Sequence, residues 1–309
     1  GGSIQAALNS GLVVDFTGSG INAITTQLTC SQNINFKCSD DSSITGYDGL
    51  GILFSGSTIT LEGINVVGFY DGTEENKTNF ATGFIRIATG TTVNLIKVVG
   101  GIATNCRTVI RAGAATSDTT TDVTIIINRV IIDSNKIDGC PMAYHFRCRY
   151  IDVKITNNTC LNAISSSNGL TPYQFYLDGL GFDDPTYKLI GNLVFSGNYA
   201  NTIVNRTTTG DSSPGNAYEC HFLKASGEKI TITDNIVIDC TGVTSDCESF
   251  YTKARYVIIS DNVIIDGGSN EGAINIKGNA SDAAGTNTSP FGEYSIISGN
   301  HIVFTRDSY

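Results

Sequence analysis

One short motif recurs along the chain from about residue 130 onward: an apolar run, a polar pair that ends in Asn, and a second apolar run. Its Asn residues are Asn135, Asn158, Asn198, Asn235, Asn262 and Asn300, spaced 23, 40, 37, 27 and 38 residues apart. A strand with alternating side chains buries one face, and a single coil of such strands cannot bury that face alone. We therefore predict an all-β fold, a right-handed parallel β-helix of roughly nine to ten stacked coils.

The Asn of each motif falls at the predicted turn between two strands, where Asn tolerates left-handed backbone geometry. Stacked Asn side chains can also hydrogen-bond from one coil to the next. We therefore interpret the Asn column as structural rather than catalytic. The variable spacing is what surface loops of different length between fixed strands would produce.

A second strand column lies between the Asn motifs, and each member ends in a charged residue. The charged residues are Arg86, Arg111, Arg147, Asp178, Lys224, Lys253 and Lys277. The residue before each charge is mostly apolar and is expected to face the core, so alternation turns the charge outward. We predict one column of charges that is interrupted at Asp178, with solvated surface charges as the simplest interpretation.

The beginning of the chain predicts a cap. Residues 3–10 have the pattern of a short amphipathic helix that ends at Gly11, and residues 12–16 that of a strand. A helix there would cover the open end of a solenoid. We predict one domain over residues 1–309, with residues 1–16 as the N-terminal cap. The start at Gly1-Gly2-Ser3, without Met, suggests an excised fragment that lacks its flanking domains.

Composition limits the partners of this chain. Hydrophobic residues make up 40% of its 309 residues, yet no run of about 18 apolar residues occurs, so we expect no membrane insertion. The formal net charge of −10 argues against binding to nucleic acid. Nine cysteines without a CxxC pair are expected to be buried, reduced thiols, which suits a reducing cytoplasm. We predict no metal and no cofactor.

The chain resembles the pectin-lyase-like β-helix superfamily. The resemblance is carried by Ile4-Gln-Ala-Ala-Leu8 with Val13–Phe16, by residues 52–64, and by the Asn repeats up to Asn300. Within that superfamily it is similar to bacteriophage tailspike depolymerases, which are trimers that cut bacterial surface polysaccharides. The resemblance implies a homotrimer on a virion tail that assembles in the host cytoplasm; a secreted protein is the alternative. No signature motif of pectate lyases or polygalacturonases is present, so no catalytic residue is carried over.

The longest inserts between repeats flank the coil at residues 173–178. They span residues 179–188 and 202–216, and a third long insert further along the chain spans residues 279–294. Long insertions in solenoids are where function is commonly added. We therefore expect the site on the middle coils.

Glycoside hydrolysis needs two carboxyl groups, about 5–5.5 Å apart for retention and about 6.5–9.5 Å for inversion. Adjacent coils stack about 4.7–4.9 Å apart, so carboxylates on neighbouring coils fall near that range. Glu219 and Glu248 each lie five residues before a Lys and are expected to stack. Asp178, between Arg147 and Lys224, is expected to stay ionised as a nucleophile or base. Asp183 is a further candidate; ordinary turn or charge-balancing roles are the alternatives for all four carboxylates.

Candidate substrate-binding residues lie in the same strand column. Arg147, Lys224 and Lys253 are expected to line a groove for an acidic sugar. His145 is expected to face outward beside Arg147, and His221 to be partly buried; a structural role is the alternative for both. Tyr144, Tyr176 and Tyr251 are expected to stack on sugar rings or to pack against the protein.

Three functions remain open from the sequence. The first is a hydrolase of bacterial capsule or O-antigen. The second is a polysaccharide lyase that acts on uronates, in which a Lys of lowered pKa removes the proton next to the carboxylate. The third is an adhesin that binds glycan without cleaving it.

Overall fold

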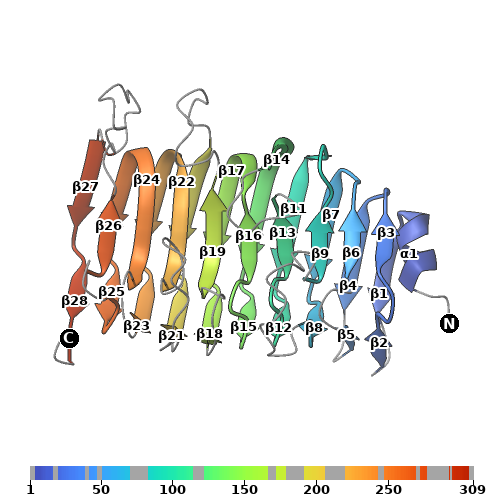
Figure 1. Ribbon diagram of the computed structural model, residues 1–309, viewed down its shortest axis with the longest axis horizontal. Coiled ribbons are helices and arrows are strands. Elements are labelled where there is room, and N and C mark those ends of the chain that lie inside the picture. Colours follow the sequence, from blue (N-terminus) through green and yellow to red (C-terminus); the bar gives the residue numbers. More distant parts are fainter. Residues whose placement is uncertain are drawn as a thin grey trace, which may run out of the picture.

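The computed structural model describes residues 4–16, 20–38, 42–46, 51–69, 83–113, 122–165, 172–178, 191–205, 220–242, 247–268, 272–276, 292 and 294–305. All pairings between named strands in these residues are parallel, and the strands stack along one axis from the N-terminal helix to the C-terminal end (Figure 1). The predicted right-handed parallel β-helix is confirmed. Each coil contributes strands to three faces.

The first face carries the second strand column of the sequence repeat. Its strands are, in stacking order, β3 (Leu28–Cys30), β6 (Ile52–Phe54), β9 (Ile85–Ile87), β13 (Ile110–Ala112), β16 (Tyr144–Phe146), β19 (Tyr173–Asp178), the beginnings of β22 (Cys220–Thr233) and β24 (Cys247–Ser260), and β26 (Ile274–Ile276).

The second face leads into the Asn turn. Its strands are β1 (Val13–Phe16), β4 (Ile34–Cys38), β7 (Thr58–Glu62), β10 (Thr92–Val93), β11 (Leu95–Val99), β14 (Asp122–Asp133), β17 (Cys148–Thr156), β20 (Asn192–Ser196), the ends of β22 and β24, and β27 (Tyr294–Ser298). Because β22 and β24 continue from the first face to the second, the two faces belong to one 18-stranded sheet.

The third face follows the Asn turn and is a separate 10-stranded sheet. Its strands are β2 (Ile21–Ala23), β5 (Ser43–Thr45), β8 (Asn65–Val67), β12 (Ile102–Thr104), β15 (Lys136–Asp138), β18 (Thr159–Ser165), β21 (Tyr199–Asn205), β23 (Ile236–Gly242), β25 (Val263–Ile265) and β28 (His301–Val303). One of these strands per coil gives ten coils among the described residues, which agrees with the predicted number.

The predicted Asn column forms a continuous hydrogen-bonded ladder. The side-chain amide of each Asn donates to the side-chain oxygen of the next at 2.9–3.0 Å, through Asn135, Asn158, Asn198, Asn235, Asn262 and Asn300. That oxygen also accepts from the backbone N–H of the preceding ladder residue, for example from Asn198 N to Asn235 Oδ1 at 2.9 Å. The ladder therefore satisfies buried backbone groups at the turns from Asn135 to Asn300 between the second and third faces.

One detail of the turn prediction is wrong. The left-handed backbone belongs to the residue before each ladder Asn, as in Ser134 (φ 56°), Asn157 (φ 57°), Asp234 (φ 58°) and Asp261 (φ 58°). The ladder Asn itself is not among the positive-φ residues. Its side chain points to the interior, so its role is to bond along the stack rather than to tolerate αL geometry.

The core consists of side-chain columns that run along the axis. On the second face one column passes through Ile132, Ile155, Phe195, Ile232 and Ile259. Phe195 packs edge-on against Phe222, with ring centroids 5.1 Å apart. Each coil thus buries its apolar face against its neighbours, as the repeat predicts.

The N-terminal cap is confirmed as helix α1 (Ile4–Ser10) followed by strand β1, with Gly11 at φ +62° between them. The side chain of Gln5 donates to Thr29 O at 2.8 Å and accepts from Thr29 N at 3.1 Å. These two bonds pair the backbone N–H and carbonyl of Thr29 at the edge of β3, as a neighbouring strand would. The side chain of Leu8, 1% exposed, covers the end of the core.

The cysteines agree with the sequence prediction. All nine are free thiols, and all except the half-buried Cys38 are buried. Burial raises the pKa of the Cys148 and Cys160 thiols well above the ordinary value. None of the helices in the described residues is long and apolar enough to cross a membrane.

Candidate functional site

The outer surface of the first face carries polar and aromatic side chains that are nearly shielded from solvent on strands β16 to β24 and just after β16. The following are at most 8% exposed: His145, Arg147, Tyr176, Asp178, His221, Lys224 and Glu248. Alternation alone predicts their charges to be solvated, which is wrong. Alternation assigns a side chain to the outer face of a sheet but does not tell whether that face is covered.

The strand register contradicts the predicted single column of charges. Arg86 does lie beside Arg111, but the column then continues through His145, Tyr176, Lys224, Tyr251 and Asn275. A second outward column, two residues further along the strands, contains Arg147, Asp178, Ser226 and Lys253. A two-residue shift keeps each side chain on the same face, so alternation cannot separate these two registers.

Asp178, at the end of β19, is the first buried carboxylate of this face, at 0% exposure. Arg147 Nη2 donates to its Oδ2 at 2.9 Å, and Ser226 Oγ donates to its Oδ1 at 3.0 Å. The predicted neighbour Arg147 is therefore in contact with Asp178, whereas Lys224 lies opposite Tyr176. The Tyr150 hydroxyl donates to the backbone carbonyl of Ser226, which fixes that partner in turn.

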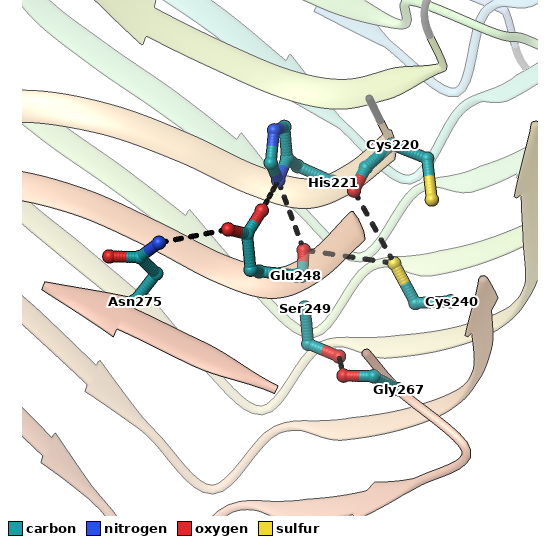
Figure 2. A network of polar contacts seen from close by, with 7 residues as sticks. All are labelled: Cys220, His221, Cys240, Glu248, Ser249, Gly267 and Asn275. Atoms are coloured by element: carbon teal, nitrogen blue, oxygen red, sulfur yellow. Dashed lines mark hydrogen bonds and ion pairs between the residues drawn. The ribbon is translucent and has the colours of Figure 1, made fainter. Parts of the chain in front are cut away.

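Glu248, the second residue of β24, is the other buried carboxylate, also at 0% exposure (Figure 2). Its Oε1 accepts from Asn275 Nδ2 at 2.9 Å, and its Oε2 lies 3.0 Å from His221 Nδ1. The same ring nitrogen lies 3.2 Å from the Glu248 backbone carbonyl. Glu248 is therefore not an exposed turn residue but the centre of a three-residue polar chain that crosses three coils.

The predicted stacking of Glu219 on Glu248 is contradicted by the register. Cys220 lies opposite Cys247, so the residue beside Glu248 is His221. The prediction assumed that Lys224 on β22 lies opposite Lys253 on β24. Lys224 lies opposite Tyr251 instead, so the assumed register is wrong by two residues. Aligning Cys220 with Cys247, two small apolar residues that both face the core, would have given the correct register from the sequence.

Stacked aromatic rings lie between Asp178 and Glu248 on the outward side of the first face. Tyr173 stacks on His221 with ring centroids 5.1 Å apart, and Tyr176 stacks on His145 at the same distance. Lys224 Nζ lies 5.0, 5.6 and 4.9 Å from the ring centroids of Tyr173, Tyr176 and Tyr251. These contacts are in the range of cation–π interactions. Of the proposed sugar-stacking residues, Tyr176 is buried and Tyr251 half-buried, while Tyr144 belongs to the core.

Asp178 and Glu248, the two buried carboxylates of the first face, are too far apart to act as a catalytic pair. Asp178 lies opposite Ser226, and Ser226 opposite Lys253, which is five residues after Glu248. Five strand residues and two inter-strand steps separate the carboxylate positions by roughly 15–20 Å. Glycoside hydrolysis by two carboxyl groups requires that they lie less than about 10 Å apart. Each carboxylate would therefore need a different partner.

The remaining candidates fall outside the described residues. They are Glu219 and Asp183; Lys277, the last member of the predicted charge column, and most of the predicted loops 179–188, 202–216 and 279–294 also lie outside them. Lys253 is half-buried on β24. The side chains that sequence reasoning did not single out are Asn275, Ser226 and Tyr173, none of which stands out from its neighbours without the register.

The described residues contain no group of three or more His, Cys, Asp or Glu side chains arranged to hold a metal ion. The fold and this face together define a parallel β-helix with a buried polar and aromatic site on the outer surface of its middle coils. No protein-family model, curated protein or solved structure matches the chain.

Proposed function

We propose that this chain is a polysaccharide depolymerase of the bacteriophage tailspike type, which binds bacterial surface polysaccharide along the first face and hydrolyses it. The observation that carries the proposal is the burial of Glu248. Its carboxylate lies on the outward side of the solenoid wall and yet is fully shielded from solvent. Burying a carboxylate costs free energy unless it is paired, and His221 and Asn275 supply the partners. Such groups cluster at functional sites.

In this proposal Glu248 exchanges the proton with the glycosidic oxygen, and His221 holds its carboxyl group in position. Tyr173, Tyr176 and Tyr251 provide apolar faces against which sugar rings can pack. Glu219 and Asp183 are the remaining candidates for the second carboxylate, because Asp178 is too distant. Asp178 keeps a separate role: it holds Arg147 on the same face.

A lyase is the second candidate, and the cations of the first face favour it. Lys224 is caged by three tyrosines, and Arg147 lies over Tyr176 with Cζ 5.1 Å from its ring centroid. Cations in these positions would neutralise a uronate carboxylate, which eases removal of the adjacent proton. The products separate the two reactions: elimination leaves an unsaturated sugar, and hydrolysis does not.

The proposal includes a homotrimer on the virion tail that acts at the bacterial surface after assembly in the host cytoplasm. Nine cysteines without a disulfide suit assembly under reducing conditions. Secretion is the alternative location.

The test is digestion of purified capsules and O-antigens by the full chain, followed by size, reducing ends and ultraviolet absorbance of unsaturated products. Glu248→Gln should lower turnover by about 10²–10⁴-fold, because the substituted amide cannot exchange a proton. Asp152→Asn is the matched control: this carboxylate on β17 of the second face is 56% exposed and should be dispensable.

Cleavage at the normal rate by Glu248→Gln would remove Glu248 from the mechanism. New reducing ends without absorbance support hydrolysis, and absorbance supports the lyase instead. A glycan that binds to the first face but stays intact would identify the adhesin.

A further inference from the structure

His145 on β16 is a buried histidine whose polar atoms have no hydrogen-bond partner. The residue is 2% exposed, and neither Nδ1 nor Nε2 is bonded to any group. A neutral imidazole carries one donor and one acceptor, and buried polar atoms are nearly always bonded. Its ring is held flat against Tyr176, with an angle of 7° between the ring planes. Both ring nitrogens of this firmly held histidine are therefore available to a polar ligand.

Three buried arginines surround this histidine. Arg111, on the neighbouring strand β13, lies directly opposite His145, and Arg147 follows His145 by two residues. The backbone carbonyl of Arg107 accepts a hydrogen bond from the N–H of Met142, which is on the same coil as His145. These arginines are 3%, 8% and 8% exposed, respectively. Burial and then the charges of Arg111, Arg147 and Arg107 hold the pKa of His145 well below its ordinary value, so the ring is neutral. Among the described carboxylates, Asp178 is bonded to Arg147, and the backbone N–H of Asp122 donates to the carbonyl of Arg147.

We infer that His145, Arg107, Arg111 and Arg147 form a subsite that binds the carboxylate of an acidic sugar unit. The inference rests on the proposed function, and it specifies an acidic polysaccharide as the substrate class. Guanidinium groups match a carboxylate through two parallel hydrogen bonds, and a neutral histidine can donate one more. Nearly complete burial strengthens such charge-assisted bonds.

The subsite lies on the same surface as Glu248. His145 is three inter-strand steps from β24, and its column is three residues from that of His221 and Glu248. This places the two groups roughly 15–20 Å apart, within reach of one bound oligosaccharide. The rings of Tyr176, Tyr173 and His221 fill the interval between them. The acidic unit would therefore bind a few sugars away from the cleavage point.

The test is NMR of the full chain with isotope-labelled histidine at neutral pH. His145, His221 and His301 are the three histidines, and His145→Gln assigns the first of them. The probes are glucuronate, glucose and acetate. Glucuronate should shift the His145 signal at concentrations where glucose and acetate do not, and His301 should stay unchanged.

Arg111→Gln should weaken glucuronate binding about tenfold or more, since one charge-assisted contact is lost. Arg107→Gln is the second variant, to be used if Arg111→Gln does not fold. Arg129→Gln is the control, because Arg129 lies on the second face with a side chain that is 61% exposed. Glucuronate binding should be unchanged in it.

An unmoved His145 signal, equal binding of acetate and glucuronate, or unchanged affinity in folded Arg111→Gln or Arg107→Gln would overturn the subsite. These results leave the depolymerase proposal standing if a neutral polysaccharide is cleaved. Glucuronate binding with no polysaccharide cleaved would support the subsite while the depolymerase proposal fails. The two proposals can therefore fail separately.

Discussion

At the scale of single residues, His145 shows what burial on the outer face of a solenoid does to a titratable group. Its ring is stacked on Tyr176 and surrounded by Arg107, Arg111 and Arg147. Both burial and the positive charges disfavour the imidazolium form. Protonation of this residue therefore works against the folded state.

The pH dependence of stability tests this directly. In the unfolded chain His145 should titrate near about 6.5, whereas its pKa in the folded protein is well below that value. Between these values only the unfolded chain takes up the proton, so this contribution to stability is complete above about pH 6.5 and is lost as the pH falls. The wild type should lose up to about 2 kcal/mol more than His145→Gln between pH 7 and pH 5.

Urea unfolding followed by circular dichroism at the two pH values measures this difference. His301→Gln, a substitution of the exposed histidine on β28, is the control and should behave like the wild type. An equal pH effect in the wild type and in His145→Gln would mean that His145 titrates normally.

The sequence identified many residues of the candidate site but not their partners. Alternation placed Asp178, Lys224 and His145 on the outer side of their strands, and Glu248 was proposed from its spacing to Lys253. Their contacts depend on the register, and the register depends on turn lengths that alternation does not specify. The pairing of His221 with Glu248 was missed for this reason.

At the scale of the structural elements, the Asn ladder joins the coils at the turn between the second and third faces. Asn235 is a typical member, 0% exposed. It donates to Phe195 O, Thr233 O and Asn262 Oδ1, and it accepts from the backbone and side chain of Asn198. Replacing it breaks bonds within its own turn and to both neighbouring turns at once.

Asn235→Ala should lower the free energy of unfolding by about 2–4 kcal/mol, because it leaves the backbone N–H of Asn198 and buried carbonyls unsatisfied. Asn128→Ala is the matched control, since Asn128 is only half-buried and its bond to Asn94 on the neighbouring coil is exposed to solvent. That change should cost less than about 0.5 kcal/mol. Chemical unfolding of both variants measures the difference, and equal costs would show that the ladder does not stabilise the stack.

The sequence predicted the ladder correctly because the motif Asn recurs at one position relative to its two flanking strands. It misassigned the left-handed residue, which is Asp234 rather than Asn235 in this turn. Asn and Asp both tolerate that geometry, so a dipeptide of the two does not show which one adopts it. The burial of Asn235 and its bonds along the stack identify its role.

At the scale of the whole molecule, the coils form one stack with a cap at its N-terminal end (Figure 1). The buried polar side chains lie on the first face, from β16 to β24. The repeated motif determines the stack because each coil must bury its apolar face against the next. No repeated motif determines the proposed reaction. The polar face differs from coil to coil, and its chemistry follows from individual contacts such as those of Glu248.

The most direct test of the account is a crystal structure of the full chain carrying Glu248→Gln, soaked with an oligosaccharide of the polysaccharide it binds. The account predicts sugar rings on the first face, against Tyr173, Tyr176 and Lys224, with a glycosidic oxygen next to residue 248. Sugar bound on the second or third face, with the first face empty, would contradict it.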